Sequence, residues 1–293
     1  DDPDRSDVLL ALEGEMIHFD FVTSERIEQP VVFINGDNET QTSVTQRDNS
    51  SGFQDGRHWR ASYLVGSSDR DVSEVVFSIS SFIDPAGNTN SKTDFSIDDN
   101  GSRKVAIDVT APQLISGSVV FSTSNTINDD EDDSSRLLVK NDETIYLDFE
   151  TNERIDIPSV TINGIALNST SDVSPIDNDT SGTKWRASYT PSGLSLDVRT
   201  VSFSVDRMDD PAGNTEDTLT SFNVDDSQKT VRIDVEKPAV KPGSIRFSTF
   251  DTMNDDYDDS SRLLAKNDET IYLDFETNER IDIDSLTVEI NGS

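Results

Sequence analysis

Cysteine is absent from this chain of 293 residues, and histidine occurs only twice. The lack of cysteine excludes disulfides and every zinc, haem or iron–sulfur site that needs a thiolate ligand. Hydrophobic residues make up only 32 % of the chain, and no apolar run approaches the ~20 residues that a membrane helix needs. Neither a signal peptide nor a lipidation motif is visible. We therefore expect no membrane insertion by this segment.

Positive charge is scarce as well. Lys and Arg together number 24 against 58 Asp and Glu, which gives a formal net charge of -34. A field of this sign repels nucleic acid and anionic lipid headgroups, and it attracts cations. Two interpretations of the acidic residues stay open and can hold together: they keep the surface soluble in salty water, and some of them bind Ca²⁺. Nucleic acid is not an expected partner.

An internal repeat organises the whole chain. Ser135 to Leu138 recurs as Ser261 to Leu264, a shift of 261 − 135 = 126, and the segment 141–157 recurs unchanged as 267–283. Near the start the shift is 145 − 17 = 128, and the two-residue difference falls in the loop before Trp59. Loops absorb insertions more readily than strands do, so the shift in spacing leaves the repeat intact.

Proline-containing segments at Pro112 and Pro238 predict the domain boundaries. The expected domains are residues 1–112, 113–238 and 239–293. The first lacks the opening strand that residues 118–121 provide in the second, and the third holds only the N-terminal part of a repeat. We therefore expect the chain to be a window on a longer array.

Apolar residues alternate with polar ones inside each repeat. Ile145, Leu147 and Phe149 share one face of a predicted strand, while Tyr146 and Asp148 lie on the other. This period of two is typical of strands with one apolar face, and two such sheets pack on those faces as a sandwich. Turn signals such as Asn-Gly separate the runs, and no window shows a sustained helical period. The pattern predicts an all-β chain of tandem immunoglobulin-like β-sandwich domains.

The motifs follow one another in a distinctive order. Each of the first two repeats has, in order, T-x-E-R-I, an I-N-G turn, W-R-A-S-Y, V-x-F-S, D-P-A-G-N and an exit strand I-D-V-x-x-P. This order resembles the bacterial immunoglobulin-like repeat domains of large extracellular adhesins and surface proteins, and the resemblance covers the whole chain. It implies extracellular or cell-surface extender modules, often stiffened by Ca²⁺ near the domain junctions.

No catalytic pattern is visible. His18 aligns with Tyr146, and His58 aligns with Lys184, so a repeated active site could not use either histidine. The chain lacks G-x-S-x-G, phosphate-loop and H-E-x-x-H motifs. Carboxylate pairs occur everywhere and therefore carry no information about acid–base catalysis. We expect no enzymatic activity and no catalytic residue.

Acidic runs are the first candidate for Ca²⁺ binding, because Ca²⁺ takes oxygen ligands. One run precedes each repeated S-R-L-L segment, and the alternative is a solvated loop, since blocks of like charge are often disordered. The candidate ligands are Asp129, Asp130, Asp132 and Asp133, with the counterparts Asp255, Asp256, Asp258 and Asp259.

A second candidate is a set near the domain junctions. It consists of the D-P-A-G-N turn residues Asp84 and Asn88, their counterparts Asp210 and Asn214, and the exit-strand residues Asp108 and Asp234. For the turn alone we favour a purely structural role, because Asx hydrogen bonds explain its Asp and Asn. Asp98 and Asp99 match Asp225 and Asp226 more loosely, at a shift of 225 − 98 = 127.

Two further features have structural interpretations. Asp177, Asp179, Ser181 and Gly182 resemble the start of an EF-hand loop, but Ser188 stands at position twelve, where a bidentate Glu is needed. We interpret the segment as an ordinary loop. Trp59 and Trp185 alternate with arginines and are therefore expected in the core rather than on a sugar-binding face.

The sequence favours a non-catalytic extender, in which repeats supply length for a secreted or cell-surface stalk, adhesin or filament. The alternatives are an adhesive module that binds a glycan or protein, and a self-assembling sheath or surface-layer subunit whose strand edges pair between chains. The expected partners are neighbouring repeats of the same chain and, in a filament, other copies.

Overall fold

The computed structural model describes residues 7–290, apart from 39, 96–97, 99–102, 126–132, 218–219, 250–254, 257–258 and 282. The chain divides into two compact units, one of Asp1–Gly193 with Val198–Ile233 and one of Leu194–Asp197 with Asp234–Ser293. The first unit contains two copies of the sequence repeat. Residues 7–109 are called the first repeat below, and residues 113–193 with 198–233 the second repeat.

The described residues are all-β. Their helical content is two 3-10 turns, η1 (Ile176–Asn178) and η2 (Ile283–Ser285). Within the described part of the chain, no helix has the length and apolar character needed to span a membrane.

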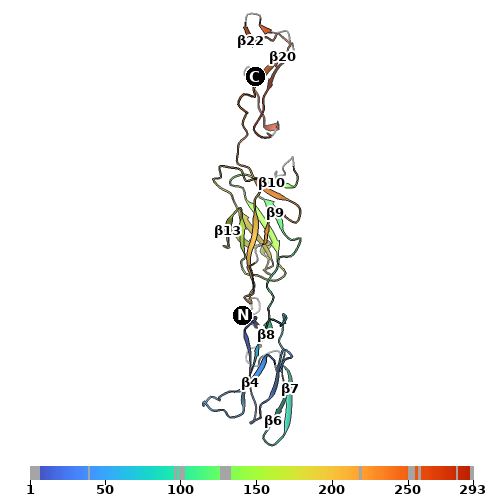
Figure 1. The fold of residues 1–293 in the computed structure, drawn as a ribbon, viewed down its shortest axis with the longest axis vertical. Coiled ribbons are helices and arrows are strands. Elements are labelled where there is room, and N and C mark those ends of the chain that lie inside the picture. Colours follow the sequence, from blue (N-terminus) through green and yellow to red (C-terminus); the bar gives the residue numbers. More distant parts are fainter. Residues whose placement is uncertain are drawn as a thin grey trace. The chain divides into compact units, whose positions relative to one another are not determined.

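The second repeat has two antiparallel sheets and a parallel strand pair (Figure 1). The first sheet has the order β14-β15-β11-β9, and the second has the order β13-β12-β16-β17, with β18 also pairing β16. β10 pairs in parallel with β19. The strands are β9 (Val120–Thr123), β10 (Arg136–Val139), β11 (Ile145–Glu150), β12 (Ser159–Ile162), β13 (Ile165–Leu167), β14 (Val173–Pro175), β15 (Lys184–Tyr189), β16 (Phe203–Asp209), β17 (Thr215–Glu216), β18 (Thr220–Phe222) and β19 (Thr230–Ile233).

The core of the second repeat lies between its two sheets. Phe121 from β9 stacks on Phe203 from β16, with ring centroids 3.9 Å apart. Phe149, Trp185 and Phe203 are 0 %, 4 % and 1 % exposed, as the alternation of apolar residues predicts. The indole Nε1 of Trp185 donates a hydrogen bond to the Gly182 carbonyl at 3.0 Å, so its one polar atom is satisfied inside the core.

The first repeat has the same layers. Its sheets are β2-β5-β4 and β3-β6-β7, and β1 pairs in parallel with β8. One buried cluster draws side chains from both sheets, including Ile17 and Tyr63 from one and Val32 and Phe77 from the other. The strands are β1 (Val8–Ala11), β2 (Met16–Val22), β3 (Val31–Ile34), β4 (Thr42–Gln46), β5 (His58–Leu64), β6 (Phe77–Ile83), β7 (Thr89–Phe95) and β8 (Lys104–Ile107).

Two facing antiparallel sheets, with an early strand running parallel to the last strand, form an immunoglobulin-like sandwich in each of these repeats. The predicted fold class, tandem immunoglobulin-like β-sandwiches, is thereby confirmed. The parallel pairs also have equivalent registers, since Ala11 faces Ile107 and Val139 faces Ile233.

The second unit contains a smaller set of strands. β20 (Arg246–Thr249) pairs with β23 (Ile271–Asp274), and β21 (Asp255–Asp256) pairs with β22 (Asp259–Leu263). Apolar side chains remain exposed here, as Phe247 is 66 % exposed whereas its counterpart Phe121 is 2 % exposed. Each strand pair named above joins two strands that belong to the same expected domain. The limits of the three domains stay a prediction.

Candidate cation site at the junction of the first two repeats

Asp108 lies where the first repeat ends. It follows β8, and its backbone N–H donates to the Ala11 carbonyl at 3.0 Å, which continues the parallel pairing one residue further. Next to it, Asp71 Oδ1 accepts the backbone N–H of Val109 at 2.8 Å. These two bonds fix the exit of the first repeat and leave the Asp108 carboxylate half-buried.

Asp210 begins the D-P-A-G-N turn that follows β16 of the second repeat. Its Oδ1 accepts the backbone N–H groups of Gly213 and Asn214 at 2.7 and 2.9 Å, and its Oδ2 accepts the Asn214 side-chain amide at 2.9 Å. These are the Asx bonds expected of this turn. Unlike most turn aspartates, however, Asp210 is only 2 % exposed.

Glu153 comes from the T-N-E-R-I segment directly after β11. Thr151 Oγ1 donates to the Glu153 carbonyl at 2.6 Å and holds this segment in a tight turn. The Glu153 side chain is half-buried, and Asn152 Nδ2 donates to its Oε1 at 3.4 Å.

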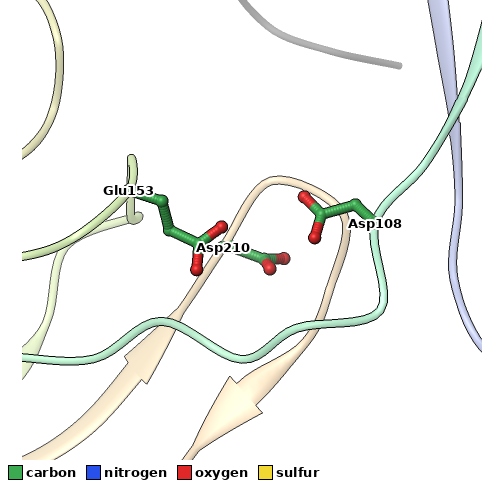
Figure 2. A group of neighbouring side chains, drawn as sticks. All are labelled: Asp108, Glu153 and Asp210. Carbon is green, nitrogen blue, oxygen red and sulfur yellow. The ribbon is translucent and has the colours of Figure 1, made fainter. Parts of the chain in front are cut away.

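These three carboxylates meet (Figure 2). One oxygen each of Asp108, Glu153 and Asp210 lies within 4.8 Å of the others. Asn214 links the two repeats at the same place, because its Nδ2 donates to the Asp108 carbonyl at 3.0 Å as well as to Asp210. The cluster therefore joins the exit of the first repeat to two separate loops of the second.

Burial, together with the crowding of like charges, raises the pKa of two of these groups. The pKa of Asp108 rises to about 6, mainly because burial disfavours its charged form and then because Asp210 and Asp71 repel it. The pKa of Glu153 rises to about 7, again first through burial and then through Asp108, Asp210 and Asp71. Within the described residues, no ion pair with Lys or Arg involves any of the three clustered carboxylates.

The donor set fits a hard divalent cation. All donors are oxygens, as Ca²⁺ prefers, and two oxygens that share one Ca²⁺ at ~2.4 Å can lie at most ~4.8 Å apart. A Ca²⁺ ion at this point would be held by Asp108, Glu153 and Asp210, with Asp71 adding negative charge close by. It would offset the repulsion that, after burial, contributes to the raised pKa of Asp108 and of Glu153.

The junction set predicted from the sequence is only partly brought together. The structure places Asp108, Asp210 and Asn214 side by side. Asp84 and Asn88 close their own turn, where Asp84 accepts the Ala86 and Asn88 N–H groups at 2.9 and 2.8 Å. That turn is exposed and lies outside the cluster, in keeping with its structural interpretation. Asp234 is half-buried at the position equivalent to Asp108 in the second unit.

The acidic runs are described only in part. Asp129, Asp130, Asp132 and Asp258 lie outside the described residues. Asp255 and Asp256 form β21, and Asp259 begins β22. Asp133 is half-buried; its Oδ1 accepts the Ser135 N–H at 3.0 Å, and its carboxylate pairs with Arg136 at 3.0 Å. Its role as a metal ligand stays a prediction.

Sequence reasoning missed Glu153 and Asp71. Both recur at the shift of 126, as Glu279 and Asp197, so the repeat did contain a signal. Glu153 was overlooked because it belongs to the T-x-E-R-I motif, and this motif looks only like the end of an apolar strand. Nothing in a linear motif shows that this strand end faces the previous repeat.

Other candidate features have local roles. Asp179 accepts the N–H groups of Ser181, Thr183 and Lys184, each at 3.0 Å, which makes segment 177–182 the ordinary loop that was expected. Asp225 accepts the backbone N–H of Phe121, and Asp226 accepts that of Val119. The two carboxylates therefore hold the opening strand of the second repeat and do not belong to the junction cluster.

Comparisons with known proteins give fold neighbours only. No protein-family model and no curated protein sequence matches the chain. Among solved structures, the I9–I11 tandem of titin is 11 % identical with a TM-score of 0.25, covering 78 % of this chain and 62 % of that one. The D1–D2 structure of Rst is 12 % identical with a TM-score of 0.30, covering 77 % and 95 %. Latent PorU from Porphyromonas gingivalis is 12 % identical with a TM-score of 0.26, covering 91 % and 27 %.

Such distant likeness adds nothing about activity, ligands or partners. The immunoglobulin-like fold rests on the strand topology described above. The resemblance to bacterial adhesin repeats stays a hypothesis drawn from the motif order.

Proposed function

We propose that this chain is a non-catalytic extender, a run of immunoglobulin-like repeats in a secreted or cell-surface stalk, adhesin or filament, whose repeat junctions bind Ca²⁺. The observation that carries the proposal is the junction cluster. Carboxylates from two repeats converge there, so a cation bound among them would tie one repeat to the next.

The near-identity of the repeats supports a mechanical role. The segment 141–157 recurs unchanged as 267–283, and copies of one module add length rather than new specificity. The junction residues recur with the repeat: Asp71, Asp108 and Glu153 have the counterparts Asp197, Asp234 and Glu279. The bond from Val109 N to Asp71 is repeated from Val235 N to Asp197, at 2.9 Å.

The charge of the clustered carboxylates explains how Ca²⁺ would stiffen the junction between the two repeats. Without a cation, the clustered carboxylates repel one another and favour separation of the two repeats. A bound Ca²⁺ reverses the sign of that local interaction, because it attracts all the carboxylates at once. The net charge of -34 favours cation binding, because it raises the local cation concentration. It also keeps the surface soluble.

The test measures junction rigidity directly. Because the chain has no cysteine, single cysteines at Ser43 in β4 and Ser174 in β14 allow one spin label on each repeat. We expect a broad distance distribution in chelator and a narrow one in Ca²⁺. An Asp210→Asn, Glu153→Gln variant, which removes two of the carboxylates, is expected to remain broad under both conditions. Equal distributions with and without Ca²⁺ in the unaltered chain would contradict the proposal.

A further inference from the structure

The turn between β1 and β2, residues 12–15, lies at the exit of the first repeat and is called the exit turn below. Two bonds close it: the Glu15 N–H donates to the Leu12 carbonyl at 3.1 Å, and Glu15 Oε2 accepts the Leu12 N–H at 3.2 Å. The Asp108 N–H binds the carbonyl of Ala11, the residue before Leu12. The exit turn and the end of the exit strand are therefore neighbours.

Leu12 of the exit turn reaches the second repeat. A Cβ placed at Gly213, in the D-P-A-G-N turn, would lie 3.8 Å from Leu12 Cδ2, so the leucine side chain lies over the backbone of this glycine. The φ angle of Gly213 is +104°, a conformation that L-residues rarely adopt. At Gly87, the equivalent glycine of the first repeat, such a Cβ would have no heavy atom within 4 Å.

Asn214 provides the second half of this contact. Its Nδ2 donates to the Asp108 carbonyl at 3.0 Å, and Figure 2 shows Asp108 beside the turn that begins at Asp210. Neither the amide nor the carbonyl is charged, so this bond and the Leu12 contact need no cation. The counterpart Asn88 donates within its own turn, to Asp84 Oδ2 at 2.7 Å.

The contact covers part of the D-P-A-G-N turn. Residues 211, 212 and 214 are half-buried in the second repeat, whereas the equivalent residues 85, 86 and 88 of the first repeat are exposed. Removing apolar surface from water favours the docked arrangement whether or not a cation is present.

The residue at the position of Leu12 differs between otherwise equivalent turns. The N–H groups of Glu143 and Glu269 donate to the carbonyls three residues earlier, at 3.3 and 3.2 Å, so the backbone of the turn is the same in each copy. The counterparts of Leu12 are Lys140 and Lys266. A lysine cannot bring its ammonium group over a glycine backbone without losing water, so it would have to turn away.

We propose that the exit turn is a docking surface for the D-P-A-G-N turn of the following repeat, and that the side chain at its first position sets how strongly the two repeats are coupled without a cation. This inference rests on the extender function proposed above and adds a protein contact to its cation. The Leu12 contact and the Asn214 bond oppose the repulsion of the clustered carboxylates. They also hold Asp108 and Asp210 near each other before any cation binds.

The test is hydrogen exchange of the whole chain in chelator, which removes any contribution of a cation. In Leu12→Lys, amides of residues 208–216 are expected to exchange about three- to tenfold faster, although the substitution lies in the other repeat. Amides of residues 82–90, which contain the equivalent turn of the first repeat, should be unchanged. Leu12→Met keeps an apolar side chain and should behave like the unaltered chain. Leu64→Lys, at a 46 % exposed leucine of the same repeat, is the matched control and should have no effect on residues 208–216.

Asn214→Ala tests the contact from the second repeat. It is expected to speed exchange of residues 105–111 in the first repeat, whereas Asn88→Ala, which removes the same side chain from the equivalent turn, is not. The proposal is overturned if Leu12→Lys leaves residues 208–216 unchanged, if Leu12→Met acts as strongly as Leu12→Lys, or if Asn214→Ala and Asn88→Ala act alike on residues 105–111. A chain in which Ca²⁺ leaves the spin-label distances unchanged, but in which Leu12→Lys still speeds exchange, would contradict the cation site and support the docking surface.

Discussion

The side-chain amide of Asn214 donates to the backbone carbonyl of Asp108 at 3.0 Å, and this bond joins the D-P-A-G-N turn of one repeat to the exit strand of the repeat before it. A motif that looks like a self-contained turn thus has a second role. The same Asn214 amide also binds Asp210, so the turn holds a buried carboxylate against the junction.

Glu153→Gln is expected to change stability in opposite directions with and without Ca²⁺. In chelator the variant should melt at a higher temperature, because it removes one member of a crowded carboxylate group. In Ca²⁺ it should melt lower than the unaltered chain, because a ligand is lost and Ca²⁺ affinity falls by about tenfold or more with ligand charge. A ligand at a hundredfold excess over its Kd stabilises the folded state by about 2.7 kcal/mol, so the difference is measurable by calorimetry.

Glu25→Gln is the matched control for this variant. Glu25 occupies the same place in the T-S-E-R-I segment of the first repeat and is exposed. It should have little effect under either condition. A Glu153→Gln variant that behaves like Glu25→Gln in Ca²⁺ would contradict the assignment of Glu153 as a ligand.

The pH dependence of the metal-free chain follows from the same cluster. The folded-state pKa rises from 3.8 to about 6 for Asp108 and from 4.5 to about 7 for Glu153. The folded state therefore binds more protons than the unfolded state between about pH 4 and 7, so these two groups lower stability as pH rises through that window. Melting in chelator should fall from pH 5 to pH 7.5, and Asp108→Asn, Glu153→Gln should flatten the slope. A slope unchanged in the double variant would contradict the raised pKa of both groups.

Much of the fold could be predicted from the sequence, because it depends on local periodicity. The alternation around Phe149, Trp185 and Phe203 places these side chains in the core, and all three are buried. The cation cluster could be predicted only in part. Asp108 and Asp210 stand in visible motifs, whereas Glu153 joins them only through the way in which two repeats meet, which no single repeat encodes.

The same limit applies to the pair Asp225 and Asp226. In sequence they look like two more carboxylates in an acidic chain, and their alignment with Asp98 and Asp99 is offset by one residue. Their role depends on a strand about a hundred residues earlier, since Asp225 binds the N–H of Phe121. Contacts at that separation leave no periodic trace in the sequence.

Asp225→Ala is expected to destabilise the second repeat by about 1.5–3 kcal/mol, the range for hydrogen bonds to charged groups. Loss of the carboxylate leaves the Phe121 N–H without its acceptor in a buried place. Asp98→Ala, at the equivalent position of the first repeat, is expected to cost under about 0.5 kcal/mol, because Asp98 is exposed. Each of these two repeats has its own tryptophan, so urea unfolding followed by Trp185 fluorescence in a Trp59→Phe background reports the Asp225 variant, and Trp59 fluorescence in a Trp185→Phe background reports the Asp98 variant. Equal costs for the two variants would contradict this role of Asp225 in holding the opening strand.

Gly182→Ala is expected to destabilise the second repeat more than Gly193→Ala does, although the two glycines have nearly the same backbone conformation. Their φ angles are +69° and +66°, a left-handed region that costs an L-residue about 1–2 kcal/mol. A Cβ at Gly182 would lie 2.8 Å from Arg154 Cγ, whereas a Cβ at Gly193 would have no heavy atom within 4 Å. The overlap adds about 1–3 kcal/mol, because Arg154 Cγ is close to the backbone and cannot move away alone. Gly182 also accepts the Trp185 indole bond through its carbonyl, so a displaced loop would disturb the core as well. Urea unfolding of both variants, followed by Trp185 fluorescence, measures the difference, and equal losses would show that Arg154 does not pack over Gly182 as described.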